Sequence, residues 1–432
     1  MTDKLAEGPR GAAVDADRAA LLAAPRPRRD LPLVALDRAR RRLPLMDDVR
    51  DEDHRYRPVD AVWEITLACD LSCRHCGSRA GKPRPDELTT EECFDVVDQL
   101  AALGVKEVIL IGGEAYLRPD LFDVVRRIRD RGMEPLLVTG GRSFTKELAA
   151  STRDAGVASV SVSLDGMRET HDRLRALKGS FDAALRTMDL LSEAGVPISA
   201  NTQINRLSMD ELEDVFETIA ARGAHSWQLQ ITTAMGRAAD EPDVLLQPYD
   251  LLALFPVLGA LADRCRERDI VLWPGNNIGY FGPIERKLRG GMARGHMASC
   301  GAGCLGIGIE SNGTVKGCPS LATKTWAAGN VRDERLETLW LRAPALRAMR
   351  KRSVDELWGY CKSCYYAETC FAGCTWTSES LMGRPGNNPI CHHRALEHDR
   401  QGLRERLVQR EAAPGDPFDH GRFEIVVEPA QR

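Results

Sequence analysis

Short apolar runs alternate with amphipathic stretches between residues 62 and 233 of this sequence. The apolar runs are rich in β-branched residues and predict buried strands; they read VWEITLA, EVILIGG, EPLLVTG, SVSVSLDG, PISANTQIN and SWQLQIT. The stretches between them repeat apolar residues with a helical period. One of them also has a capping box at Thr89 and Glu92 and a stop at Gly104. Six strand-then-helix units predict a parallel sheet covered by helices.

Two folds satisfy this alternation, a doubly wound sheet and a barrel. The regular repetition favours an α/β fold built as a partial (βα)6 TIM-type barrel. Such barrels carry their chemistry at the carboxyl ends of the strands. Polar residues and glycines gather at these ends: Cys69, Gly112, Gly113, Glu114, Thr139, Ser163, Asp165, Asn201 and Gln203. We therefore expect an open-mouthed active site at this edge of the sheet.

The amino-acid composition and the apolar periodicity change on both sides of the predicted barrel. Residues 1–58 are rich in Arg, Pro and Ala without an apolar period, and we interpret them as a mobile arm. The barrel is expected over 59–290, closed by a helix at 251–268 and the stretch WPGNNIGYFGP. Short cysteine-rich segments predict a small second domain over 291–398. A C-terminal tail, 399–432, completes the chain.

Composition narrows the class of protein and its partners. The 432 residues are 43% hydrophobic and 28% charged, as in soluble globular proteins, and the net charge of -4 attracts neither nucleic acid nor anionic membrane. No apolar run approaches the length of a membrane span, and the N-terminus lacks a signal's apolar stretch. We expect a cytoplasmic protein with no nucleic-acid or membrane partner. Its thirteen cysteines would stay reduced there, so their clustering indicates metal.

Cys69, Cys73 and Cys76 form a C-x3-C-x2-C motif directly after the first strand. Three soft thiolates on one loop can hold three corners of a cubic iron–sulfur cluster and leave one iron open. Structural zinc is the alternative, but it needs a fourth ligand. The motif resembles that of radical S-adenosylmethionine (SAM) enzymes. The resemblance implies a [4Fe-4S] cluster that binds SAM and cleaves it to a 5'-deoxyadenosyl radical, with these three cysteines as the catalytic centre.

The end of the second strand, GGEAYLRP, is similar to a GGE segment of the same family. In the family this segment contacts the amine of SAM, so the resemblance implies cofactor binding by Gly112, Gly113 and Glu114. Glycines allow close backbone approach, and a carboxylate accepts hydrogen bonds from an amine. The family usually has Pro after the Glu, and Ala115 departs from that pattern.

The fourth strand, SVSLDG, and the following HDRLR also resemble the family. The resemblance implies that Ser163, Asp165 and Arg175 lie near the ribose and carboxylate of SAM. Asn201 and Gln203, at the end of the fifth strand, are candidates of the same kind. The alternatives are a simple turn at the aspartate and a solvated charge at the arginine.

The other ten cysteines divide into two and eight. Cys93 and Cys265 lie within helical patterns and are predicted to be small buried thiols. The eight follow the order of the SPASM extension of radical SAM enzymes: an opening cysteine, Gly313-x4-Cys318, C-x2-C-x5-C-x3-C and one distant cysteine. That resemblance implies two fully ligated auxiliary [4Fe-4S] clusters, one on Cys300, Cys304, Cys318 and Cys374, the other on Cys361, Cys364, Cys370 and Cys391.

A tight-turn signal supports the first of these sets. The segment GIGIESNGTVKGC has Asn312-Gly313 between alternating residues and predicts a hairpin that brings Cys318 beside Cys300 and Cys304. Zinc ribbons are the competing interpretation of the C-x2-C pair.

The resemblance favours an enzyme that abstracts hydrogen from a peptide or protein, most simply a ribosomal peptide maturase forming an oxidative crosslink. A flavodoxin- or ferredoxin-type protein would donate the electron. An anaerobic sulfatase-maturing enzyme is one alternative, opposed by Pro319 where those relatives carry Asp. A tetrapyrrole enzyme of the haem pathways is the second. A non-catalytic iron–sulfur scaffold is the third, since a fold alone never proves a function.

Overall fold

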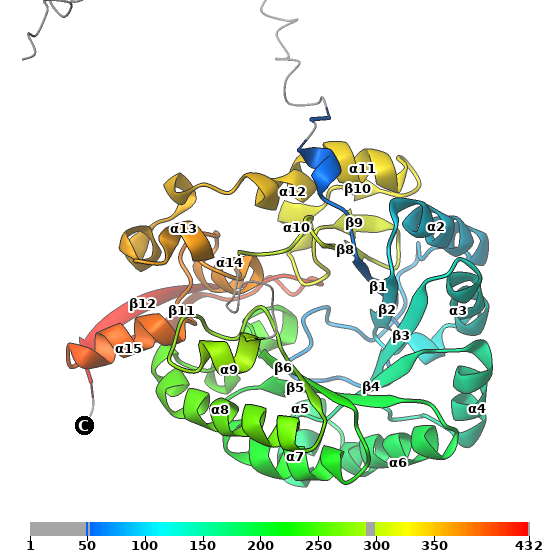
Figure 1. Ribbon diagram of the computed structural model, residues 1–432, viewed down its shortest axis with the longest axis horizontal. Coiled ribbons are helices and arrows are strands. Elements are labelled where there is room, and N and C mark those ends of the chain that lie inside the picture. The colour runs from blue at the N-terminus through cyan, green and yellow to red at the C-terminus, as the bar shows by residue number, and fades with distance from the viewer. Residues whose placement is uncertain (1–48, 51, 291–298, 431–432) are drawn as a thin grey trace, which may run out of the picture. The chain divides into compact units, whose positions relative to one another are not determined.

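A computed structural model of the chain describes residues 49–50, 52–290 and 299–430. A ten-stranded sheet runs through them in the order β10-β9-β8-β1-β2-β3-β4-β5-β6-β7 (Figure 1). Its central six strands follow one another in the chain and pair in parallel. They are β1 (Asp60–Thr66), β2 (Glu107–Gly112), β3 (Glu134–Thr139), β4 (Ser159–Ser163), β5 (Ile198–Ile204) and β6 (Ser226–Ile231).

Helices follow each of these strands and cover the outer face of the curved sheet (Figure 1). They are α2 (Thr90–Leu103), α3 (Leu121–Asp130), α4 (Lys146–Ala155), α5 (Arg168–Arg175), α6 (Ser180–Glu193), α7 (Leu212–Ala220) and α8 (Leu251–Glu267). The predicted partial (βα)6 barrel is confirmed. Its core is apolar and includes the fully buried Trp63 and Trp227, together with the thiols of Cys93 and Cys265, as expected.

The capping residues predicted for the helix after the first strand are found at both ends of α2. Thr89 begins α2 by accepting a hydrogen bond from the Glu92 backbone amide, and the Glu92 side chain accepts one from the amide of Thr89 at 2.8 Å. Gly104 ends the helix in the left-handed conformation, with φ of 87°. These caps satisfy backbone groups that the helix itself leaves unpaired, so α2 begins and ends at the predicted residues.

The cysteine-rich C-terminal region continues the sheet of the barrel. β8 pairs in parallel with β1, and β9 returns antiparallel to β8, which confirms the predicted hairpin around Gly313. The second domain is therefore joined to the first by backbone hydrogen bonds. The remaining strands of this sheet are β7 (Val271–Pro274), β8 (Gly306–Ile309), β9 (Thr314–Lys316) and β10 (Gly329–Asn330).

The predicted C-terminal tail over 399–432 is a folded element. Its strands pair antiparallel as a separate two-stranded sheet. They are β11 (Leu403–Glu411) and β12 (Arg422–Pro429). The hairpin contacts α14 and α15, and Arg394 of α15 forms a buried ion pair with Glu405 at 2.6 Å. The expectation of a tail is corrected because alternating apolar residues such as Leu407 and Phe423 are buried here.

Short helices connect the segments of the C-terminal region. They are α9 (Glu285–Arg289), α10 (Thr323–Trp326), α11 (Leu336–Arg342), α12 (Pro344–Arg347), α13 (Ala367–Cys370), α14 (Thr375–Met382) and α15 (His392–Arg400). Residues 291–298, where the second domain was expected to begin, lie outside the described residues.

The boundary of the expected N-terminal arm also needs correction. Asp53 is fully buried and pairs with Arg347 at 2.7 Å and with Arg350 at 3.3 Å. Residues 52–58 therefore belong to the folded part of the chain, because two arginines of the C-terminal region hold this carboxylate. Residues 1–48, where most of the arm was predicted, lie outside the described residues.

One stretch among the described residues, Pro242–Glu267, is long and apolar enough to cross a membrane by length and composition. The expectation that no apolar run approaches that length is therefore wrong. However, 56% of its most apolar window is buried within the fold, and α8 contacts α9, α15 and β7. The protein core accounts for the apolar face of this helix.

Candidate active site and metal centres

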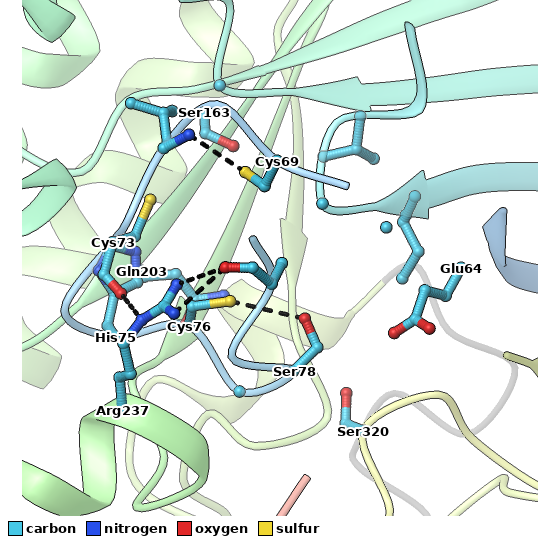
Figure 2. Close-up of a pocket in the computed structure, with 18 of the residues that line it drawn as sticks. Glu64, Cys69, Cys73, His75, Cys76, Ser78, Ser163, Gln203, Arg237 and Ser320 are labelled. Atoms are coloured by element: carbon cyan, nitrogen blue, oxygen red, sulfur yellow. Dashed lines mark hydrogen bonds between the residues drawn. The ribbon is translucent and has the colours of Figure 1, made fainter. Parts of the chain in front are cut away.

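A cavity of about 260 Å³ opens at the carboxyl ends of the central strands. Figure 2 shows the three cysteines of the first motif on one side of it and Glu64, Ser78 and Ser320 on another. Nearly all of the predicted site residues line this cavity together: Cys69, Cys73, Cys76, Gly112, Gly113, Glu114, Ser163, Arg175, Asn201 and Gln203. These residues, predicted from the sequence to form an active site at this edge of the sheet, thus lie around a single cavity.

The cysteine loop is held in place by backbone contacts and by one arginine. The amide of Cys69 donates to the carbonyl of Gly81 at 2.9 Å and so closes the base of the loop. Arg237, from the segment after β6, donates through Nε to the carbonyl of Cys73 at 2.7 Å and through Nη1 to that of Ala80 at 3.2 Å (Figure 2). These bonds orient the thiols toward the cavity without using any of them as an acceptor.

Asp165 is the one predicted cofactor contact that does not line the cavity. It is fully buried, and its carboxylate pairs with Arg175 at 2.5 Å and His75 at 3.0 Å and accepts the amide of Gln203 at 2.8 Å. Burial alone would raise the pKa of Asp165, but the charges of Arg175 and His75 hold that pKa far below its usual range. Asp165 therefore positions side chains that face the cavity.

Arg175 connects this buried carboxylate to the cysteine loop. Nη2 of Arg175 pairs with Asp165, and Nη1 lies 3.7 Å from Sγ of Cys73. Burial raises the pKa of the Cys73 thiol, and the charge of Arg175 beside it opposes that rise. The predicted role of Arg175 beside the site is consistent with this geometry, and the alternative of a solvated helix charge is wrong, since the side chain is 10% exposed.

The two glycines of the GGE segment allow β1 and β2 to approach closely at their carboxyl ends. A Cβ atom on Gly113 would lie 2.0 Å from the carbonyl oxygen of Ala68, and one on Gly112 would lie 2.1 Å from that of Thr66. Gly112 also has φ of 151°, which L-residues rarely adopt. Any side chain here would displace the strand end that leads into the cysteine loop.

Glu114 is a buried carboxylate at the floor of the cavity. It accepts hydrogen bonds from Thr139 Oγ1 and from the amide of Gly140, both at 2.6 Å. Burial raises the pKa of Glu114 to about 7 in spite of these bonds. A cationic amine entering the cavity would stabilise its charged form, which fits the role that the family resemblance implies.

The side-chain oxygen of Asn201 shows whether the residues of the cavity fit a polar cofactor. Asn201 Oδ1 lines the cavity, is buried and accepts no hydrogen bond from the described residues. Buried polar atoms are normally paired, so this oxygen indicates a ligand with donor groups. Together with Glu114 and the glycine edge, the residues present fit SAM.

The first auxiliary set comes together from three separate segments. Burial is the main cause of the raised pKa of Cys374, to about 12, and the next causes include the negative charges of Cys300 and Cys318. Cys300 is likewise among the causes of the raised pKa values of Cys304 and Cys318, each about 11. Cys300, Cys304 and Cys318 also pack in one buried cluster of side chains. The influence of Cys300 and Cys318 on Cys374 indicates that the fourth thiol lies near this cluster.

The second auxiliary set is enclosed. Its four thiols line one small cavity together: Cys361, Cys364, Cys370 and Cys391. Backbone amides donate to two of the sulfurs, from Asn388 to Cys361 and from Tyr366 to Cys364, each at 3.4 Å. Tyr280 separates this set from the first, and its hydroxyl accepts the amide of Cys374 at 2.9 Å.

Among the described residues no three His, Cys, Asp or Glu side chains converge as the ligands of one metal ion do.

Several cavity residues were not predicted from the sequence. They are Glu64, Arg237, Met235, Ser320, Trp376 and Phe418. Trp376 donates through Nε1 to the sulfur of Met235 at 3.2 Å, and the amide of Phe418 donates to the carbonyl of Gly77 at 3.0 Å. A lone charge in the apolar run VWEITLA was a usable signal for Glu64. No pattern marked Trp376 or Phe418, which tertiary packing brings to the cavity.

Comparison with known proteins agrees with this geometry. The sequence profile described as the Radical SAM superfamily matches residues 63–219, and that of the SPASM iron-sulfur cluster-binding domain matches 300–365. The AdoMet-dependent heme synthase of Methanosarcina barkeri is 31% identical over 334 residues, 74% of this chain and 92% of that protein. The chain belongs to the radical SAM enzymes with a SPASM domain. This membership implies SAM and iron–sulfur clusters as cofactors.

Two further proteins are similar to this radical SAM enzyme. Mycofactocin maturase MftC of Mycobacterium tuberculosis is 30% identical over 385 residues, 86% of this chain and 90% of that protein. Streptococcus suis SuiB, solved with its precursor peptide SuiA, shares the fold with a TM-score of 0.60 at 15% identity, covering 78% of this chain and 76% of that one. The relatives are thus named as a heme synthase and as a maturase.

Proposed function

We propose that this radical SAM enzyme is a ribosomal peptide maturase that forms an oxidative crosslink in a peptide or protein. When bound, SAM and the cluster on Cys69, Cys73 and Cys76 supply a 5'-deoxyadenosyl radical that removes a hydrogen atom from the substrate. The chain's own residues orient the reactants and exclude water. Glu114 and Asn201 hold SAM, while Arg237 keeps the cysteine loop in register.

The charges that line the cavity favour a peptide over a tetrapyrrole as the substrate. Each basic side chain of the described lining already has a partner within the protein. His75 and Arg175 pair with Asp165, and Arg237 bonds to backbone carbonyls. A tetrapyrrole with several carboxylates would need free cations to bind it. A peptide needs none, and the neutral side chains of Met235, Trp376 and Phe418 offer it apolar contact.

The proposal includes three iron–sulfur clusters per chain, one at the reaction centre and two auxiliary clusters. Each auxiliary set has four thiols, which would complete the ligation of a cluster, so a cluster held there would serve electron transfer. Crosslinking removes two hydrogens from the substrate: one leaves as an atom to the radical, and the other as a proton and an electron. A cluster held by one of these four-cysteine sets would supply the acceptor for that electron. A flavodoxin- or ferredoxin-type protein in the cytoplasm supplies the electron that starts each cycle.

The heme synthase of Methanosarcina barkeri favours a second candidate, an enzyme of the haem pathways that modifies a side chain of a tetrapyrrole. This second candidate function uses the same cluster chemistry, but it predicts that the enzyme binds an iron porphyrin tightly. The sulfatase-maturing alternative is disfavoured by Pro319, and a non-catalytic scaffold would not cleave SAM at all.

Direct competition of substrates tests the proposal. The anaerobically reconstituted enzyme is given SAM and dithionite with either synthetic peptides encoded by short reading frames beside its gene or iron coproporphyrin. We expect a peptide to lose the mass of two hydrogens and the porphyrin to remain unchanged. Cys73→Ala is the control and forms no 5'-deoxyadenosine. Loss of carbon dioxide from the porphyrin, with all peptides unchanged, contradicts the peptide assignment.

A further inference from the structure

Glu64 is a carboxylate in the middle of β1 that the proposed chemistry does not yet use. Its neighbours Trp63 and Ile65 are buried in the apolar core, whereas Glu64 lines the cavity and is itself only 2% exposed. A buried charge in a core strand is costly unless it is paired or functional. The contacts of Glu64 show which of its two oxygens is paired.

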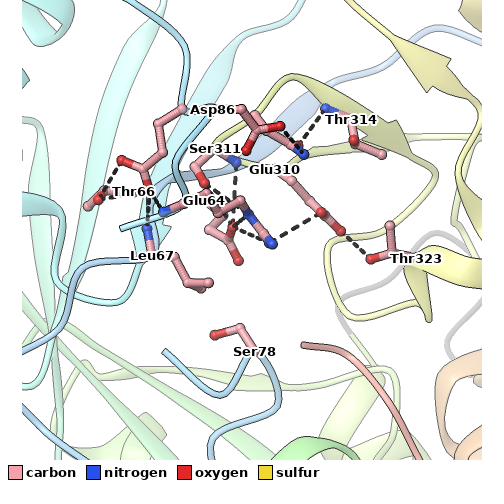
Figure 3. Close-up of polar contacts among 12 residues, drawn as sticks. Glu64, Thr66, Leu67, Ser78, Asp86, Glu310, Ser311, Thr314 and Thr323 are labelled. Atoms are coloured by element: carbon pink, nitrogen blue, oxygen red, sulfur yellow. Dashed lines mark hydrogen bonds and ion pairs between the residues drawn. The ribbon is translucent and has the colours of Figure 1, made fainter. Parts of the chain in front are cut away.

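One oxygen of Glu64 takes every hydrogen bond that the structure gives this side chain. Oε1 accepts from Arg84 through Nη2 at 2.8 Å and Nε at 3.3 Å. It also accepts from Ser311, through Oγ at 3.3 Å and the amide at 3.4 Å (Figure 3). A carboxylate held by four donors on one oxygen has a fixed orientation.

The two cations near Glu64 also form ion pairs with another carboxylate, that of Glu310. Arg84 also pairs with Glu310 at 3.2 Å, and Lys316 pairs with the second oxygen of Glu310 at 2.8 Å. Lys316 further donates to the carbonyl of Leu321 at 2.7 Å. Glu64, Arg84, Glu310 and Lys316 thus form one linear series of ion pairs, of which Figure 3 shows the Glu64 and Glu310 members. No cation of this series is left to turn toward the other oxygen of Glu64.

The second oxygen, Oε2, is available on the cavity side. Figure 2 shows Glu64 on the same side of the cavity as Ser78 and Ser320. Ser320 and Ser78 line the same cavity, and each hydroxyl has two lone pairs that can accept a hydrogen bond. Ser78 Oγ also lies 3.5 Å from Sγ of Cys76, a contact in which either atom can be the donor. One carboxylate oxygen and two hydroxyls make three acceptors.

We propose that Glu64 Oε2, flanked by Ser78 and Ser320, binds a basic side chain of the substrate peptide and so determines which peptides are accepted. This inference rests on the proposed peptide maturase function. An ammonium group has three N–H donors for three acceptors, and a guanidinium group has five. A charge-assisted bond is about twice as strong as a neutral one, which makes the contact selective. Burial raises the pKa of Glu64, and a cationic side chain beside Oε2 would stabilise the charged form of this carboxylate.

A peptide library tests this without knowledge of the natural substrate. The reconstituted holoenzyme with SAM is immobilised under anaerobic conditions and incubated with acetylated, amidated octapeptides of random sequence. Retained peptides are sequenced by mass spectrometry. We expect Lys or Arg to be enriched about 10-fold at one position on the wild type, the factor that one charge-assisted contact supplies. Glu64→Gln retains peptides without that enrichment, because the amide keeps its shape but loses its charge.

Two controls separate binding from folding. Glu134→Gln removes an exposed carboxylate at the start of β3 and is expected to leave the enrichment unchanged. An enriched peptide is also resynthesised with norleucine in place of lysine and is expected to bind the wild-type enzyme about 10-fold more weakly. That comparison needs no variant, so it decides the matter even if Glu64→Gln fails to fold.

The outcomes distinguish this inference from the function on which it rests. Equal enrichment of basic residues on Glu64→Gln, or equal binding of the norleucine peptide, overturns the role of Glu64 and leaves the peptide function standing. Retention of no peptide by the wild type, together with binding of iron coproporphyrin, overturns both.

Discussion

The first cysteine group and the two C-terminal groups use the same side chain in different surroundings. Cys69, Cys73 and Cys76 lie on one loop and face a cavity of about 260 Å³. The eight C-terminal thiols come from separate segments, and four of them enclose a small cavity lined by aromatic rings. A missing fourth thiol leaves a position for a reactant, whereas complete ligation leaves none. The number of thiols in each group is therefore the feature that would distinguish a reaction centre from electron carriers.

The largest expected effect comes from removing one ligand of each kind. Cys73→Ala should abolish 5'-deoxyadenosine formation under dithionite, because the cluster that binds SAM loses a ligand. Cys370→Ala should still cleave SAM but form no crosslinked product. Chromatography of 5'-deoxyadenosine measures the first step. Equal loss of SAM cleavage in both variants would remove the distinction between the two regions.

Iron analysis of the same proteins sharpens this distinction. Three cubic clusters predict about twelve irons per wild-type chain and about eight in each variant. About four irons in the wild type would mean that the C-terminal thiols hold no clusters.

A smaller effect is expected where the backbone is crowded next to the first cysteine loop. Gly113→Ala places a Cβ 2.0 Å from the carbonyl of Ala68, so the strand end must shift. We expect a loss of about 3 kcal/mol in unfolding free energy and weaker SAM binding. Gly81→Ala, which meets nothing within 4 Å, is the matched control and should stay within about 0.5 kcal/mol. Thermal unfolding and equilibrium dialysis with SAM measure both variants.

The C-terminal hairpin offers a test of how the cavity is closed. Phe418 lines the cavity, and Lys316 Nζ lies 3.7 Å from its ring centre, while Phe423 is buried on β12 outside the cavity. Both Phe→Ala variants should lose about 3 kcal/mol of stability. Only Phe418→Ala should raise 5'-deoxyadenosine formation without substrate, because it opens the cavity to water. An equal rise in both variants would assign it to general loosening of the fold.

The smallest effect concerns the seam where the two regions share a sheet. Asp60 starts β1 between Glu107 of β2 and Gly306 of β8. Burial, together with repulsion by Glu107, raises the pKa of Asp60 to about 6 from 3.8. Its contribution to stability is therefore full below about pH 3.8 and is lost as the pH rises through about 6. Asp60→Asn avoids that loss.

We expect Asp60→Asn to be about 2 kcal/mol more stable than the wild type above pH 7, with the gain shrinking toward pH 5. Thermal unfolding across this pH range measures it. A gain that does not change with pH would assign the effect to packing. Glu134→Gln, which removes an exposed charge at the start of β3, should stay within about 0.5 kcal/mol.

Much of the fold and of the metal centres follows from local spacing. The six strand-then-helix units, the hairpin at Gly313 and the assignment of Cys93 and Cys265 to the core depend on residues close in sequence. The division of eight thiols into two sets depends on a motif order that the family resemblance supplied. The expected tail was wrong because the buried face of β11 carries a charge, Glu405, which hides the apolar alternation in the sequence and is paired with Arg394 only in the fold.

The sequence by itself determined which residues lie at the strand ends, since a short loop after a strand can reach only that edge. Tertiary structure decided what those residues do there. Asp165 is turned away from the cavity because Arg175 and His75 neutralise it in the interior. Glu64 is oriented by Ser311, 247 positions away in sequence. Contacts over such distances depend on how β1 and β8 come to share a sheet, which no local pattern encodes.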